Sequence, residues 1–365
     1  MEQTIEQKPI DLTKRKYFNI LDGAMACIGF VALQYIIYFL MGVTGGIQNH
    51  FMYEFWSIAL QSCFVLAVII TAKARKVDWI HACTLKNKIN GKIVLYALLI
   101  SVICLFAFNN LTSAFGAMME KLGYVSPFET GDYSEYNQIT NIGQFLIAIF
   151  TTCIVPPLCE EILFRGAVLN SFRGLNKWVA ILISGFMFMI MHGNPDQTVF
   201  QFMLGCVLSY VAWETKNIWI CVIIHAINNF IAICIQFYYG LLGDMSSGEV
   251  LEEATEAVTY SWGDIIFTAI YGIAWAALGI FLVIKLVKKM KASTQTAPQT
   301  QQNQPEMIVQ TAESSEAVVI TEESEVQPKP SKQQVVLTVL LYLAFASYFI
   351  KSWITYLLTG LGVII

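Results

Sequence analysis

The stretch Cys159-Glu160-Glu161-Ile162-Leu163-Phe164-Arg165 places two carboxylates and one guanidinium inside a long apolar run that begins near Ile142. A charged side chain at the centre of a membrane-spanning helix costs about 2.5–3.5 kcal/mol on insertion scales. Because proteins keep such charges mainly where they have a function, we interpret this stretch as a functional site inside a membrane helix.

The composition supports a membrane protein. The chain has 365 residues, of which 56% are hydrophobic and only 13% are charged, whereas soluble domains carry about 25% charged residues. We therefore expect an all-α fold, a polytopic bundle of transmembrane helices with the lipid bilayer as its partner. The net charge of −4 does not suggest a nucleic-acid partner. The nine cysteines lie mostly in apolar runs and are interpreted as small hydrophobic residues.

Apolar runs long enough to cross a bilayer, which takes about 20 residues, divide the chain into about eight spans and a C-terminal apolar segment. The predicted order is a cytoplasmic tail at 1–16, spans one to three within 17–118, an external loop at 119–140, a core of spans four to seven at 141–240, an acidic external loop at 241–262, span eight at 263–287, a disordered cytoplasmic linker at 288–334 and a membrane segment at 335–365. The linker is rich in polar residues and cannot bury a core. Lys351 interrupts the last segment, which is either one tilted helix or a hairpin of two short ones.

Loop charges predict the orientation of the bundle. Basic residues cluster before span one and after spans two, four, six and eight, and the acidic loops fall on the other side. We expect an integral membrane protein of a bacterial plasma membrane. By the positive-inside rule, its N-terminus and linker lie on the cytoplasmic side.

The two adjacent carboxylates are not equivalent. Glu161 and Arg165 are four residues apart, so they share a helix face and can pair. Glu160 points about 100° away and has Phe164 at the matching position, which leaves its carboxylate available as a general base or acid. Pro156-Pro157 precedes the pair and kinks the helix. A purely structural ion pair would explain Glu161 and Arg165 but not Glu160.

His192 ends the fifth span, one helical turn after Phe188. The loop between spans four and five is centred near residue 176, and Glu160 and His192 are equally distant from it in sequence. In a helical hairpin, equal distance from the turn means equal depth, so we expect these two side chains to meet. A histidine at a helix end is otherwise often a simple interface residue.

His225 and Asn229 are four residues apart on the seventh span and face the same way. Asn228 is a neighbour that could take the place of Asn229 in any role. Both polar residues could instead serve only to hold helices together through hydrogen bonds.

The polar set as a whole is suited to hydrolysing an amide. A carboxylate beside a histidine can activate water, and a second histidine with an asparagine can donate hydrogen bonds to a developing oxyanion. The same Glu160, His192 and His225 could instead bind zinc, which takes three protein ligands and a water in catalytic sites. The HExxH signature of zinc proteases is missing.

Three motifs in this set resemble those of the CAAX prenyl protease and bacteriocin-processing family of intramembrane endopeptidases, also called the CPBP or Abi family. Its EExxxR, FxxxH and HxxxN motifs correspond to Glu160–Arg165, Phe188–His192 and His225–Asn229, in order and each in its own apolar run. The resemblance covers residues 141–240 and does not extend to the linker or the C-terminal segment.

The resemblance implies an all-helical membrane protease acting on a peptide or membrane-anchored substrate. Glu160 and His192 would activate water, and His225 and Asn229 would stabilise the oxyanion. Glu161 and Arg165 would hold the site together. Members are commonly labelled metalloproteases, and a metal-free glutamate mechanism has also been argued, so zinc stays open. The alternative is a non-catalytic membrane protein: a bacteriocin self-immunity factor, a scaffold or a transporter. Many transporters contain inverted repeats, which we do not find in this sequence.

Overall fold

The protein is an all-α bundle, as expected. The computed structural model describes residues 15–126, 139–245, 260–295 and 330–363, and within these ranges the chain forms helices and no strand, apart from one isolated bridge between Arg15 and Val77. Residues 1–14 of the predicted tail, 127–138 of the predicted external loop, 246–259 of the predicted acidic loop and 296–329 of the predicted linker lie outside the described residues.

Seven of the described helices are long and apolar enough to cross a membrane. They are α1 (Ile20–Val43), α2 (His50–Arg75), α4 (Gly91–Lys121), the helix that runs through Ile142–Ser171, α12 (Ile218–Met245), α13 (Trp262–Gln295) and α14 (Lys332–Gly360). The polytopic membrane fold predicted from composition is therefore confirmed. The C-terminal segment is one continuous helix and not a hairpin of two.

Asparagine side chains cap the N-termini of four of these helices and of the shorter helix Lys177–Met191. The side chains of five N-cap residues accept a hydrogen bond from a backbone N–H in the first turn: Asn19, Asn49, Asn90, Asn141 and Asn176. An N-cap of this kind satisfies a backbone donor that has no partner within the helix. The first helices accordingly begin a few residues away from the edges of the apolar runs.

The fourth span is continuous but irregular. It consists of α7 (Ile142–Ala148), the π-helical segment η1 (Ile149–Ile154), α8 (Val155–Glu161), a second π-helical segment η2 (Ile162–Val168) and α9 (Leu169–Ser171). Short π-helical segments inside α-helices are frequent at functional sites. Here they flank the two carboxylates of Glu160 and Glu161.

The predicted fifth and sixth spans are shorter than the others. They form α10 (Lys177–Met191) and α11 (Thr198–Thr215), joined through the 3₁₀ turn η3 (Pro195–Gln197). With 15 residues, α10 is about 22 Å long, which is less than the hydrocarbon thickness of a bilayer. The tip of this hairpin carries His192.

Gly185 and Gly205 let the two hairpin helices approach each other closely. A Cβ added to Gly185 would lie 2.5 Å from the Cys206 sulfur, and one added to Gly205 would lie 3.1 Å from the Gly185 backbone. Small residues at helix interfaces are typical of membrane proteins, because close packing there replaces the hydrophobic effect.

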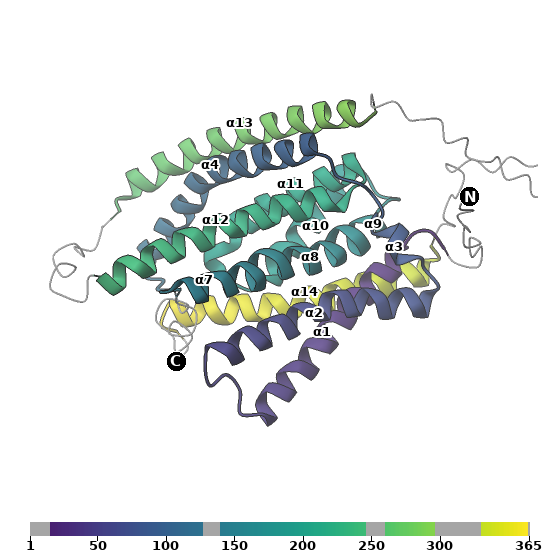
Figure 1. Ribbon diagram of the computed structural model, residues 1–365, viewed down its shortest axis with the longest axis horizontal. Coiled ribbons are helices and arrows are strands. Elements are labelled where there is room, and N and C mark those ends of the chain that lie inside the picture. Colours follow the sequence, from purple (N-terminus) through teal and green to yellow (C-terminus); the bar gives the residue numbers. More distant parts are fainter. Residues whose placement is uncertain (1–14, 127–138, 246–259, 296–329, 364–365) are drawn as a thin grey trace, which may run out of the picture.

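The remaining helices surround the site-bearing elements on two sides. α4 and α13 lie side by side along one edge of the bundle, and α1, α2 and α14 pack together along the opposite edge (Figure 1). The centre contains α8, α10, α11 and α12 (Figure 1). A short helix, α3 (Trp79–Ala82), lies between α2 and α4 in the chain.

Candidate active site

The two prolines before the carboxylates leave a backbone carbonyl without its usual partner. The Thr152 carbonyl would bond to the N–H of residue 156 in an α-helix or of residue 157 in a π-helix, and both are prolines. The Asn229 side chain on α12 replaces these donors: its Nδ2 donates to the Thr152 oxygen at 2.9 Å. This bond ties α12 to the fourth span, about two turns before Glu160.

Glu161 and Arg165 form the buried pair that their spacing predicts. Arg165 Nη1 donates to Glu161 Oε1 at 2.8 Å, and both side chains are fully buried. Arg165 Nη2 donates to the Gly205 carbonyl of α11 at 3.1 Å. The guanidinium also lies over the Phe188 ring, with Cζ 4.4 Å from the ring centre. These contacts compensate for part of the hydration that the buried guanidinium loses, although Arg165 Nε and Glu161 Oε2 have no hydrogen-bond partner among the described residues.

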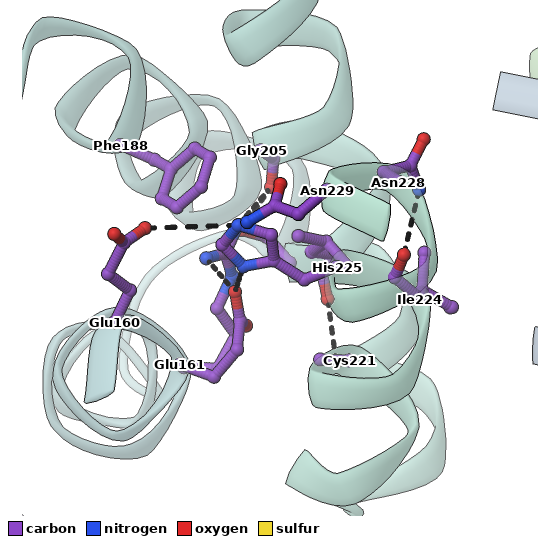
Figure 2. Close-up of polar contacts among 12 residues, drawn as sticks. Glu160, Glu161, Phe188, Gly205, Cys221, Ile224, His225, Asn228 and Asn229 are labelled. Carbon is purple, nitrogen blue, oxygen red and sulfur yellow. Dashed lines mark hydrogen bonds and ion pairs between the residues drawn. The ribbon is translucent and has the colours of Figure 1, made fainter. Parts of the chain in front are cut away.

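His225 joins both carboxylates to α12. Its Nδ1 lies 3.1 Å from Glu161 Oε1, and its Nε2 lies 4.0 Å from Glu160 Oε2. Figure 2 shows Glu160 and Glu161 projecting from one helix toward the His225 ring on the other. The imidazole therefore lies between a carboxylate that is already paired and one that is not.

Glu160 is buried but is not part of the ion pair. It is 4% exposed, and its Oε1 accepts a hydrogen bond from Gln61 Nε2 at 3.2 Å. Its Oε2 has no hydrogen-bond partner among the described residues. The unpaired carboxylate predicted from helix geometry is thus present, with one oxygen directed toward His225.

His192 lies at the tip of the hairpin, next to Phe188. Its Nδ1 is 2.8 Å from the Phe188 carbonyl oxygen, one turn earlier in the chain. The Phe188 ring contacts both histidines, with ring centres 4.8 Å from His192 and 5.5 Å from His225. His192 therefore reaches the cluster through Phe188, while a direct contact with Glu160 stays a prediction.

The two neighbouring asparagines on α12 differ in direction. Asn228 Nδ2 donates to the Ile224 carbonyl of its own helix at 2.8 Å, and the side chain points away from the carboxylates (Figure 2). Asn229 is on the side of His225. Of the two alternatives, Asn229 is the one that the fold places at the site.

Three contacts of the site do not follow from the sequence motifs. They are made by Gln61 from α2, by the Gly205 carbonyl and by the Thr152 carbonyl. Gln61 carried a signal in the sequence, because it is a polar side chain in the first half of an apolar run. Pro156-Pro157 signals that the Thr152 carbonyl lacks a helical donor, whereas the Gly205 carbonyl carries no signal.

The residues present do not form a three-ligand metal site. In the described parts of the chain, no three His, Cys, Asp or Glu side chains are gathered so that they could hold a metal ion. Glu160 Oε2 and His225 Nε2 lie 4.0 Å apart, and in the described parts of the chain no hydrogen bond or ion pair joins His192 to either of them. The reaction proposed for this site therefore uses only protein side chains and water.

Comparison with known proteins supports the motif assignment. Residues 142–231 match the family model described as type II CAAX prenyl endopeptidase Rce1-like. That range contains the two carboxylates, Arg165, both histidines and Asn229, and it ends before α13.

Two bacterial proteins are similar to parts of the chain. An "Uncharacterized protein" of Mycoplasma capricolum is 26% identical over 209 residues, which cover 53% of this chain and 59% of the relative. The "Putative membrane peptidase YdiL" of Bacillus subtilis is 28% identical over 91 residues, 25% of this chain and 37% of the relative. The chain thus spans less than two thirds of either relative. No solved structure matches the chain. As its three motifs predicted, the chain is similar over residues 142–231 to the Rce1-like type II CAAX prenyl endopeptidases.

Proposed function

We propose that this integral membrane protein is an intramembrane endopeptidase that hydrolyses a peptide bond of a peptide or membrane-anchored substrate. The observation that carries the proposal is the buried Glu160 carboxylate, whose Oε2 has no hydrogen-bond partner among the described residues and faces His225 Nε2 at 4.0 Å. A helix-locking ion pair does not need this second carboxylate. A general base does.

His192 is suited to work beside Glu160 as a hydrogen-bond acceptor for the attacking water. Because a carbonyl oxygen can only accept, the Phe188 carbonyl requires the proton on His192 Nδ1. In the neutral imidazole, Nε2 then carries a lone pair. In this proposal, Nε2 of His192 and Glu160 Oε2 orient the attacking water.

The proposed reaction balances without any further reagent. Water attacks the carbonyl carbon of the peptide bond, its proton passes to Glu160, and a tetrahedral oxyanion forms. The C–N bond then breaks, and Glu160 returns the proton to the leaving nitrogen. The products are a new carboxyl terminus and a new amine terminus.

His225 and Asn229 are our candidates for stabilising the oxyanion. Glu161 Oε1 already accepts from Arg165, so the His225 proton on Nδ1 is donated to the same carboxylate. Asn229 Nδ2 uses one of its two N–H groups on Thr152 and keeps the second for the substrate.

The test compares membrane-associated and secreted peptides, by mass spectrometry, from cells carrying wild type or Glu160→Gln. Glutamine keeps the size of the side chain and its acceptor for Gln61, but it cannot take up a proton. We expect at least one peptide or protein terminus to disappear in the variant while the protein level is unchanged.

A matched control is Glu214→Gln, which removes a carboxylate at the end of α11, where it pairs with Lys177 at 2.6 Å and lies outside the site. Its peptide profile should equal that of wild type. If the Glu160→Gln profile also equals that of wild type, hydrolysis by Glu160 is wrong, and a scaffold or immunity role becomes the better interpretation. Zinc measured in the purified protein, with Glu160→Gln beside it, tests the metal question separately.

We also propose that the protein lies in a bacterial plasma membrane with its N-terminus in the cytoplasm. The basic residues at the end of α2, at the start of α10 and at the end of α13 support this orientation.

A further inference from the structure

The first half of α2 carries a row of polar side chains on one face. Its members are spaced four, three and four residues apart: His50, Glu54, Ser57 and Gln61. Positions i, i+4, i+7 and i+11 lie on the same side of an α-helix. Polar groups in a membrane-spanning helix are costly, and such a row therefore indicates a function.

The row leads from the first turn of α2 to the candidate active site. Glu54 is only 9% exposed, and its Oε1 lies 3.5 Å from His50 Nε2. Two turns further on, Gln61 Nε2 donates to Glu160 Oε1 at 3.2 Å. The distance along α2 from His50 to Gln61 is about 16 Å.

The bond from Gln61 decides which oxygen of Glu160 is available. Because Oε1 is held by Gln61, Oε2 is the oxygen that lies 4.0 Å from His225 Nε2. A glutamine is well suited to this task, since it orients a carboxylate without adding charge to a cluster that already holds two carboxylates and a guanidinium. The Gln61 Oε1 atom is buried and has no hydrogen-bond partner among the described residues, so an acceptor remains beside Glu160.

We propose that Gln61 is a positioning residue of the active site, which holds the Glu160 carboxylate so that Oε2 faces His225 and the reacting groups. This inference rests on the proposed endopeptidase function. It adds a residue from α2, outside the matched range 142–231.

The first test reads the hydrogen bond directly and needs no substrate. Infrared spectra of the purified full chain in nanodiscs are recorded for wild type and Glu160→Gln, and their difference isolates the Glu160 carboxyl band. The same difference is then recorded in a Gln61→Met background. We expect the band to shift, because Met has a similar length but no donor.

Ser62→Ala is the matched control, since the Ser62 hydroxyl donates to the Ile58 carbonyl of its own helix at 2.8 Å. The Glu160 band should stay in place in that variant. A band that is the same in wild type and in the Gln61→Met background would overturn the proposal, whatever the activity of the protein.

The second test uses whichever terminus disappears in Glu160→Gln cells. Gln61→Met should slow its formation about tenfold or more, mainly through kcat, because a hydrogen bond to a charged group is lost. If Glu160→Gln abolishes cleavage and Gln61→Met does not slow it, the role of Gln61 is wrong and the protease assignment stands. If Glu160→Gln changes nothing, the protease assignment itself fails.

Discussion

Arg165 holds the polar centre of this protein together at the scale of single residues. Its guanidinium joins Glu161, the Gly205 carbonyl and the Phe188 ring, and Glu161 in turn bonds to His225. Removing one partner of a buried ion pair leaves the other charge uncompensated, which is far costlier than exchanging an unpaired polar group. In the proposed function, Glu161 therefore has the structural role and Glu160 the catalytic one.

We expect Arg165→Met to lower the free energy of unfolding by about 3–5 kcal/mol. Glu160→Gln should lower it by about 1 kcal/mol or less, because the bond to Gln61 is kept. Denaturant titration of the purified variants in micelles measures both. Equal losses in the two variants would contradict the division of roles between Glu161 and Glu160.

At the scale of elements, the decisive feature is the loss of backbone hydrogen-bond donors at Pro156-Pro157 in the fourth span. The prolines leave the Thr152 carbonyl without a helical donor, and α12 supplies one through Asn229 at 2.9 Å. The missing backbone donor of the fourth span is therefore replaced by a side chain of α12. This bond ties the helix that carries Glu160 to the helix that carries His225 and Asn229.

A double-mutant cycle tests this link between the fourth span and α12. Asn229→Ala should cost about 1–3 kcal/mol of stability, because a buried carbonyl loses its partner. In a Pro156→Ala background the cost should be smaller, since an alanine at this position brings back a backbone N–H for the Thr152 carbonyl. Stability of the four proteins is compared by denaturant unfolding.

Asn228→Ala serves as the control for that cycle, because its amide bonds only to Ile224 in its own helix. Its cost should be the same with and without Pro156. Strict additivity of Asn229→Ala and Pro156→Ala would rule out the proposed link.

On the scale of the whole molecule, the C-terminal helix packs against the hairpin tip where His192 lies. Trp353 Nε1 on α14 donates to Thr198 Oγ1 at the start of α11 at 2.8 Å. The Gly360 carbonyl accepts from Val125 N at 2.8 Å. A Cβ built on Gly193 would lie 3.6 Å from Ser352 Cβ. α14 is therefore in contact with the tip of the α10–α11 hairpin.

A cysteine pair tests this arrangement. The separation of 3.6 Å between the two Cβ positions suits a disulfide, so Gly193→Cys with Ser352→Cys should cross-link on oxidation. A protease site inserted between residues 296 and 329 then separates α14 from the rest of the chain. We expect the fragment to stay attached on a non-reducing gel and to be released by reductant.

The control pair replaces Ser352→Cys with Ile354→Cys, at an exposed position of α14. It should not cross-link with Gly193→Cys. Release of α14 without reductant from the Gly193/Ser352 pair would show that α14 is not held at the hairpin tip. A cysteine at Gly193 costs about 1–2 kcal/mol because φ there is 60°, so the total yield is measured as well.

Composition and local spacing were enough to determine the membrane fold and the pairing of Glu161 with Arg165, because these depend on hydropathy and on helix periodicity alone. The family resemblance came from the three sequence motifs. The two short hairpin helices, the single C-terminal helix, the contact of Gln61 with Glu160 and the bond of Asn229 to Thr152 were decided only by the tertiary structure. The two contacts join residues that are distant in sequence, and the helix lengths depend on where the neighbouring elements of the chain begin and end. The Pro156-Pro157 pair marks the Thr152 carbonyl as lacking a helical donor, but only the fold decides which side chain replaces that donor. The Gly205 carbonyl carries no sequence signal, because every residue type has the same backbone carbonyl.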